Sequence, residues 1–266
     1  MLIIIPFLFT LLITSLNCEQ AKNAENKNEK STFEKLWQYG FKGFASAAFK
    51  NAAQYTIKFG GRKSNIVNVY DKTVKSSLGN PKWFARVDAP HGNVPFHHIN
   101  VNKGVTGVKD PHTPISETMA KAAGEVGKVL DHINQAAPAF MAISVASDVY
   151  EFACEAKKDY DNESTRNTVQ KAATTAATTG GSLAGSTAGA AIGTAIFPGV
   201  GTLVGSLVGG ACGGVGGGMG GEAVSDALFD VFGYGIDDIK CEKCGKHFRH
   251  RRYQEGPHQK LCPKCR

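Results

Sequence analysis

Residues 180–221 read GGSLAGSTAGAAIGTAIFPGVGTLVGSLVGGACGGVGGGMGG, and they hold 17 of the 31 glycines in the 266-residue chain. Glycines recur at every fourth position in two series: Gly181, Gly185, Gly189 and Gly193, then Gly201, Gly205, Gly209, Gly213, Gly217 and Gly221. A period of four places each series on one face of a helix, where the missing side chains let two backbones approach closely. The intervening Phe197-Pro198-Gly199-Val200 is typical of a turn. The stretch therefore predicts an antiparallel hairpin of two glycine-zipped helices.

The surroundings of these glycines favour a membrane location. The 50 residues between Lys171 and Glu222 contain no Asp, Glu, Lys, Arg or His. Each helix would be long enough for a hydrocarbon core of ~30 Å, and glycine costs about 1 kcal/mol per helix position in water relative to alanine. A hairpin buried in protein and a low-complexity loop are the alternatives. We expect membrane lipid as a partner, with a homo-oligomer formed through the zipper glycines as a second use of the same faces.

This region resembles the glycine-zipper hairpins of membrane-associated and toxin-linked proteins. The resemblance is compositional and covers about 50 residues. It implies membrane contact and no particular chemistry.

Two C-x-x-C pairs stand near the C-terminus: Cys241 with Cys244, and Cys262 with Cys265. Seventeen residues separate the pairs, which is typical of a structural zinc site with four thiolate ligands. This segment resembles a zinc ribbon, in which the ion holds the fold and has no open position for catalysis. Replacement of one of the later cysteines by His258, formation of two disulfides and redox activity of the C-x-x-C pairs are the alternatives.

The last segment is also basic. Residues 236–266 carry nine Lys or Arg and four acids, so they contribute +5 to a net charge of +7. Arg249, Arg251 and Arg252 form a candidate anion-binding patch between the cysteine pairs. It could contact the phosphates of nucleic acid or lipid headgroups, or it could be an ordinary solvated surface.

Residues 1–18 predict a signal peptide, because their apolar stretch is too short for a membrane span and ends in small and polar residues. A lipid anchor at Cys18 is the competing interpretation. Residues 19–32 predict a disordered spacer. Asn162 lies in an Asn-Glu-Ser triplet, a candidate glycosylation site. Together these features predict the secretory pathway.

The remaining chain divides into three predicted regions. Residues 33–63 predict a basic amphipathic helix whose aromatic stripe packs on the protein or lies on an anionic membrane. Residues 64–112 predict a small β-region with a hairpin between 82 and 102. Residues 113–170 predict two helices, from Pro114 to Gln135 and from Ala139 to Tyr160, separated near Pro138. With the hairpin at 171–235 and the zinc ribbon at 236–266, the predicted fold is mainly α.

Histidines cluster in residues 86–112, where His91, His97, His98 and His112 accompany Arg86, Asp88, Asn100 and Asp110. On a strand His97 and His98 would point to opposite faces, and His98 would share a face with Asn100. The segment from Ala85 to Asn102, which includes Arg86-Val87-Asp88-Ala89-Pro90-His91-Gly92-Asn93, also resembles regions of bacterial polymorphic toxins, which implies a nuclease-like hydrolase as the alternative function. No motif for a nucleophile elbow, phosphate loop or H-E-x-x-H site is present.

The composition bounds these expectations. Hydrophobic residues make up 42% and charged residues 20% of the chain, which excludes wholesale disorder and a many-pass membrane protein. We expect a membrane-interacting protein of the secretory pathway that is not an enzyme, acts in defence or membrane perturbation, and carries structural zinc.

Overall fold

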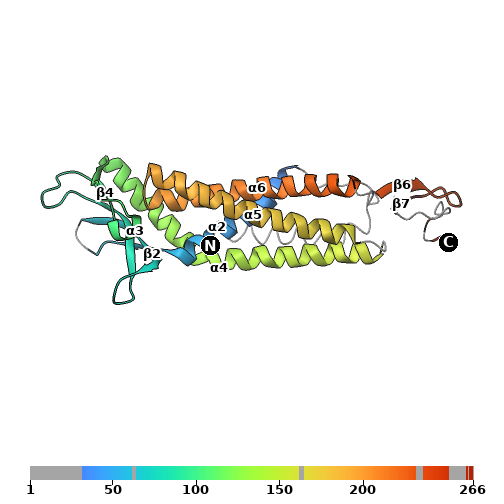
Figure 1. The fold of residues 1–266 in the computed structure, drawn as a ribbon, viewed down its shortest axis with the longest axis horizontal. Helices are drawn as coiled ribbons and strands as arrows, with labels where there is room; N and C mark the ends of the chain where they lie inside the picture. Colours follow the sequence, from blue (N-terminus) through green and yellow to red (C-terminus); the bar gives the residue numbers. More distant parts are fainter. Residues whose placement is uncertain are drawn as a thin grey trace.

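The computed structural model describes residues 32–61, 64–161, 165–231, 236–251, 262 and 264–265. Within them, a bundle of long helices connects a five-stranded antiparallel sheet at one end to a two-stranded hairpin at the other (Figure 1). The long helices are α2 (Thr32–Gln54), α4 (Glu117–Asp161), α5 (Arg166–Ile196) and α6 (Val200–Val231). The predicted signal peptide, most of the spacer, Asn162 and Arg252 lie outside the described residues.

The sheet follows chain order, and every strand pairs antiparallel with the next. Its strands are β1 (Tyr55–Phe59), β2 (Asn65–Lys75), β3 (Pro81–Asp88), β4 (His98–Val101) and β5 (Thr113–Pro114). A single-turn helix, α3 (Lys103–Thr106), follows β4. The predicted hairpin between residues 82 and 102 is confirmed as β3 and β4, with Asp88 opposite His98.

The tip of the glycine-rich hairpin packs on this sheet and forms part of the core. Val200 and Leu203 belong to the same buried cluster as Val69 and Ala85. Gly199 turns the chain at φ +88°, and a Cβ there would lie 3.0 Å from that of Ala85. Only glycine combines this backbone conformation with so close an approach. The sheet therefore fixes the tip of the hairpin at its end of the bundle.

The helix predicted over 33–63 ends at Gln54, and β1 follows it directly. Tyr55, Thr56 and Ile57 are β-branched or aromatic, and strand β2 offers them a complete ladder of backbone partners. The buried face of α2 also differs from the predicted aromatic stripe. It consists mainly of small residues such as Gly43, Ala45, Ala47 and Ala48, whereas Phe33, Leu36, Trp37 and Phe49 are exposed.

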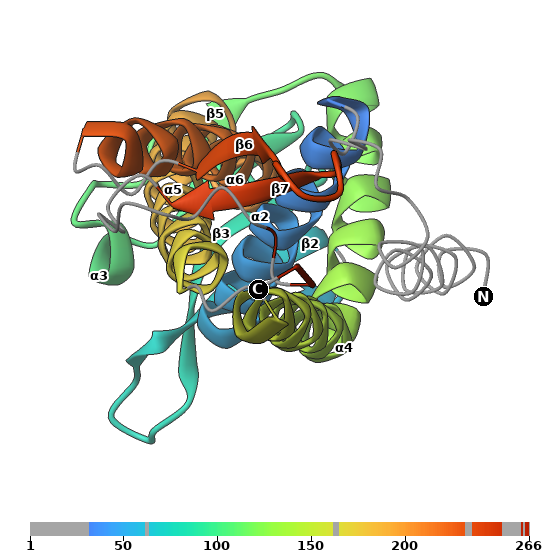
Figure 2. The ribbon, with the colours of Figure 1, turned by 90° about the vertical axis from the view of Figure 1, so that its right-hand side faces the viewer.

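The predicted separation into two helices near Pro138 is wrong, because α4 is one helix from Glu117 to Asp161, although its two halves run in different directions (Figures 1 and 2). Pro138 is exposed, so its ring projects away from the bundle and its missing N–H removes only one helical hydrogen bond. The helix also begins later than Pro114, which pairs with His98 in the sheet. The Ser116 hydroxyl accepts a hydrogen bond from the Met119 N–H at 3.1 Å and stabilises the first turn.

Candidate functional site

The two predicted glycine series lie against each other along the antiparallel helices α5 and α6. A Cβ added to Gly181, Gly185, Gly189 or Gly193 would lie 1.9–2.3 Å from the carbonyl oxygen of Gly213, Gly209, Gly205 or Gly201, respectively. A Cβ on Gly217 would lie 2.2 Å from the Ala177 carbonyl oxygen, and one on Gly221 would lie 2.7 Å from the Ala177 Cβ. Because real Cβ atoms do not come so close to a backbone, these positions exclude every other residue at the present helix separation.

A second glycine face on α6 packs against α2, and sequence reasoning missed it. Gly210, Gly214 and Gly218 also recur at every fourth position. A Cβ on Gly214 would lie 2.5 Å from the Tyr39 carbonyl oxygen, and one on Gly43 would lie 2.2 Å from that of Gly210. The period of four in this third series could have indicated a packing face, but the helix that packs on it, α2, is distant in sequence. In the view along the bundle, α2 lies between α4 and the α5–α6 pair (Figure 2).

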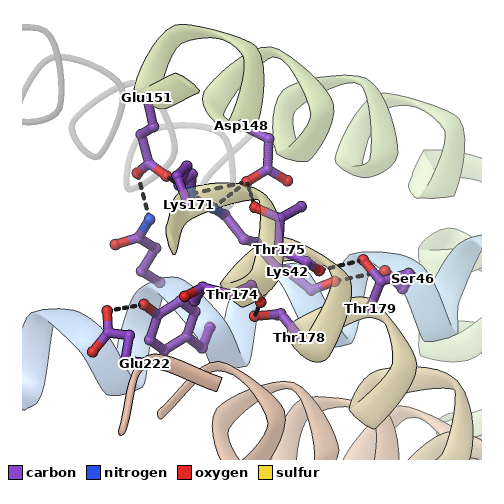
Figure 3. A network of polar contacts seen from close by, with 12 residues as sticks. Lys42, Ser46, Asp148, Glu151, Lys171, Thr174, Thr175, Thr178, Thr179 and Glu222 are labelled. Carbon is purple, nitrogen blue, oxygen red and sulfur yellow. Dashed lines mark hydrogen bonds and ion pairs between the residues drawn. The ribbon is translucent and has the colours of Figure 1, made fainter. Parts of the chain in front are cut away.

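Charged side chains are gathered inside the bundle, where α2, α4 and α5 meet. Lys42 is 5% exposed, and its Nζ lies 2.6 Å from Asp148 Oδ1 and 3.0 Å from Glu151 Oε2. Lys171 pairs with the same two carboxylates. Figure 3 shows Asp148 and Glu151 pointing from α4 toward both lysines. Two cations thus balance two anions, and of the four side chains only that of Asp148 is as much as 25% exposed.

The most exposed residues of the bundle, in contrast, are uncharged over a long belt. Glu155 and Glu222 also lie at this level, with side chains 27% exposed, and each forms an ion pair, with Lys158 and Lys35 respectively. We define the belt as the exposed residues within 36–53 of α2, 133–156 of α4, 172–196 of α5 and 201–225 of α6. None of these exposed residues is Asp, Glu, Lys, Arg or His. Lys50 is half-buried, and its Nζ donates to the hydroxyls of Ser186 and Thr187 at 3.2 and 2.9 Å. The charge pattern is therefore inverted relative to an ordinary water-exposed bundle.

The four C-terminal cysteines form a compact cluster. Cys241 and Cys244 lie at the turn between β6 (Ile236–Lys240) and β7 (His247–Arg251), and Gly245 closes that turn at φ +69°. Their sulfur atoms and those of Cys262 and Cys265 all lie within 4.8 Å of one another. The Cys244 and Cys262 sulfurs are 3.6 Å apart, whereas tetrahedral zinc–thiolate bonds of about 2.3 Å place sulfurs about 3.8 Å apart. The cluster can hold a metal ion.

Hydrogen bonds prepare one of these thiols for ionisation. The Cys262 N–H donates to Cys241 Sγ at 3.2 Å. This donor, together with those of Cys244 and Lys243, lowers the pKa of the Cys241 thiol to about 6. Metals bind the thiolate form, so Cys241 is available as a ligand at neutral pH. The alternative ligand His258 lies outside the described residues, and of the candidate anion-binding residues Arg249 and Arg251 lie on β7.

The sheet brings three of the four histidines predicted as a cluster together and leaves His97 apart from them. His98 and Asn100 on β4 are completely buried, and Asn100 Nδ2 donates to Asp88 Oδ2 at 2.7 Å. Burial raises the pKa of the Asp88 carboxyl, and the neighbouring Arg86 guanidinium opposes that shift. The rings of His91 and His112 lie 5.1 and 5.5 Å from that of His98. His97 precedes β4 and is absent from this group, so the expected alternation of His97 and His98 along one strand does not apply.

Two parts of the chain match described domain families. Residues 38–133 match the C13G5.2-like N-terminal domain, which covers most of α2, the sheet and the first part of α4. Residues 161–220 match the C13G5.2-like glycine zipper domain. The glycine-zipper prediction is thereby confirmed at the level of the domain.

The chain is also similar to proteins of Caenorhabditis elegans. "Uncharacterized protein C13G5.2" is 46% identical over 161 residues, which cover 59% of this chain and 46% of the relative. "Uncharacterized protein C06E1.11" is 53% identical over 137 residues, covering 52% of this chain and 58% of the relative. The chain thus spans about half the length of these relatives. No solved structure matches.

Proposed function

We propose that this protein is embedded in a membrane through the charge-free belt of its helical bundle. The single observation that carries the proposal is the distribution of charge: Lys42, Lys171, Asp148 and Glu151 pair inside the bundle while the exposed belt carries none. Lipid favours this arrangement, because intramembrane charges face the bundle interior and pair there. A water-exposed helix normally presents charged residues on its outer face.

The dimensions support an orientation across the membrane. Residues 172–196 of α5 would extend about 37 Å at 1.5 Å per residue, against ~30 Å for a hydrocarbon core. Among the described helices, α6 is long and apolar enough to cross a membrane, and only 39% of its most apolar 18-residue stretch is buried inside the protein. A core helix of a water-soluble protein would be mostly buried. In this orientation the sheet and the β6–β7 hairpin lie on opposite sides of the membrane.

The polar residues of α5 are compatible with this environment. The hydroxyls of Thr178 and Ser182 each donate to a backbone carbonyl one turn earlier in the same helix, at 2.7 and 2.6 Å. Lys50 can lay its aliphatic stem along the helices while its ammonium binds Ser186 and Thr187. The zipper faces are occupied within the chain by α5, α6 and α2, so a homo-oligomer would need a different surface.

Flotation with vesicles tests this proposal. Val208 in the belt and Val108 in the loop before β5 are 58% and 60% exposed, so Val208→Glu and Val108→Glu form a matched pair. A charge near the bilayer centre costs about 3 kcal/mol, which corresponds to about 100-fold weaker partitioning. We expect the parent and Val108→Glu to float with phosphatidylcholine–phosphatidylserine vesicles, and Val208→Glu to remain folded in the aqueous fraction. Equal flotation of the two variants, or no flotation of the parent, would contradict the proposal.

The cysteine cluster is proposed as a structural zinc site of the ribbon type, which would stabilise a segment too small for its own core. This rests on the sulfur spacing and on the ionisable Cys241. Native mass spectrometry of non-reduced protein should show one zinc at these thiols, all four of which alkylate after chelation. A metal-free chain four hydrogens lighter over the four cysteines would mean two disulfides instead.

The cellular context follows from the N-terminal segment. We propose that the protein enters the secretory pathway, because residues 1–18 predict a signal peptide; N-terminal sequencing of the mature chain would test this. A role in membrane perturbation predicts release of dye from the vesicles that the protein binds. Nuclease activity lost in His98→Ala, without dye release, would favour the hydrolase alternative.

A further inference from the structure

A cluster of metal-ligand types lies in the sheet, remote in sequence from the cysteine site. Asp88 ends β3, His98 begins β4 directly opposite it, and His91 lies in the loop between the two strands. One ligand atom from each of the three residues lies within 4.8 Å of the others. Asp88 and His98 are completely buried and His91 is exposed, so the cluster opens to solvent on one side.

The histidines are oriented by the same type of contact. His98 Nδ1 lies 2.9 Å from the Phe96 carbonyl oxygen, and His91 Nδ1 lies 2.8 Å from that of Ala89. A carbonyl oxygen can only accept, so each Nδ1 carries the proton and each Nε2 presents a lone pair. Metal-binding histidines are held in this way by the nitrogen that does not bind the metal.

The buried members of the cluster each carry an unsatisfied atom. His98 Nε2 and Asp88 Oδ1 are both buried and have no hydrogen-bond partner. Asn100 Nδ2 donates to the other carboxylate oxygen, Asp88 Oδ2, at 2.7 Å, and Arg86 Nε forms an ion pair with that oxygen at 3.0 Å without hydrogen-bond geometry. Buried polar atoms without partners are costly and uncommon in folded proteins, and an unfilled ligand position accounts for these two. The neighbouring Asn100 Oδ1 and Arg86 Nε are also buried without a hydrogen-bond partner, and a metal ion would not bond to them in this arrangement.

We infer that Asp88, His91 and His98 bind a divalent transition-metal ion through one carboxylate oxygen and two Nε2 atoms. Two imidazoles and one carboxylate suit zinc and its neighbours, whereas magnesium and calcium prefer oxygen ligands alone. Three protein ligands leave a fourth position for water, as in catalytic rather than structural zinc sites. This inference does not depend on the proposed membrane function.

A strained residue beside the cluster supports this assignment. His112 has φ +45°, the only positive φ of a non-glycine residue in the described part of the chain. Its N–H donates to Asp110 Oδ1 at 3.2 Å, and the Val101 N–H donates to the same oxygen. Asp110 thereby ties the His112 backbone to β4, and the His112 ring lies 5.5 Å from that of His98. Backbone strain of this kind concentrates at functional sites.

Zinc binding to the full-length chain tests the inference. Cys241→Ser, Cys244→Ser, Cys262→Ser and Cys265→Ser remove the other candidate metal site and form the background. Titration of this background with zinc should show one site per chain. His91→Ala should weaken it at least about 100-fold, since loss of even an outer-shell partner costs 10–100-fold. His97→Ala is the matched control, because His97 neighbours the cluster without belonging to it, and it should bind zinc like the background.

A second variant and a spectroscopic measurement distinguish loss of a metal ligand from loss of structure. Asp88→Asn retains an acceptor for Asn100 and Arg86 but removes the anionic ligand, and it should also weaken zinc at least about tenfold. In the background chain, zinc should shift the Nε2 resonances of His91 and His98 and leave that of His97 in place. Absence of a one-to-one site, or equal zinc affinity in His91→Ala and His97→Ala, would overturn the inference.

Discussion

Replacing Gly205 by alanine should destabilise the protein, whereas the same change at Gly216 on the same helix should stabilise it. A Cβ at position 205 would lie 2.1 Å from the Gly189 carbonyl oxygen and 2.9 Å from its carbonyl carbon. Ordinary contact begins at 3.4 Å, so α5 and α6 would have to separate locally by about 1 Å. A Cβ at position 216 would meet nothing within 4 Å.

The two substitutions therefore change the free energy of unfolding in opposite directions. Alanine is about 1 kcal/mol better than glycine within a helix, and Gly216→Ala should gain about 0.5–1 kcal/mol. Gly205→Ala has the same gain in helix propensity, but overpacking of a close interface typically costs about 1–3 kcal/mol. The added methyl group would also press on Gly193 of the facing helix. We expect a net loss of about 1–2 kcal/mol in the free energy of unfolding.

Equilibrium unfolding followed by far-ultraviolet circular dichroism, with both variants and the parent in the same mild detergent, measures this difference. Gly205→Leu and Gly209→Leu should abolish the hairpin packing altogether. If Gly205→Ala and Gly216→Ala shift the unfolding midpoint in the same direction, the close approach of α5 and α6 does not require glycine and the zipper account is wrong.

Three further perturbations test other parts of the structure. Lys42→Met should lower the free energy of unfolding by about 3 kcal/mol, because Lys171 alone then faces Asp148 and Glu151 and one negative charge inside the bundle is left uncompensated. Lys35→Met, whose ion pair is more exposed, should cost under about 1 kcal/mol in the same denaturation assay. Pro138→Ala should raise the melting temperature, with a gain of about 1–3 kcal/mol from the restored helical hydrogen bond. In metal-free protein the pKa of the Cys241 thiol is lowered from its ordinary value of 9.0 to about 6 in the folded chain. The ionised thiol therefore stabilises the fold above pH 9, and this stabilisation is lost as the pH falls through 6. Amide exchange at the turn after β6, corrected for intrinsic rates, should therefore be faster at pH 5 than at pH 8, and Cys241→Ser should remove this dependence.

The local features of the fold were predictable because their signals repeat along the chain. Glycines at every fourth position on both sides of Phe197-Pro198 predict the α5–α6 hairpin, and alternating residues predict β3 and β4. The cysteine spacing predicts a cluster in the same way. In each case the interacting residues lie close in sequence or share one period.

The remaining features depend on partners that are distant in sequence. Lys42 reads as one of several basic residues on an amphipathic helix, and only the packed bundle brings it to Asp148, 106 residues away. The continuity of α4 through Pro138 likewise could not be predicted from the sequence, and its two halves run in different directions (Figures 1 and 2). Asp88 and His98 become a pair only through the register of β3 on β4.

The central claim, that lipid covers the belt, is tested most directly at Cys212. This residue is exposed near the middle of α6, and a nitroxide can be attached to it in a chain whose other cysteines are replaced by serine. In vesicles the account predicts that the nitroxide is relaxed strongly by dissolved oxygen, which partitions into hydrocarbon, and weakly by a water-soluble nickel chelate. A nitroxide that stays as accessible to the chelate with vesicles as without them would show that the belt faces water, and the membrane assignment would be wrong.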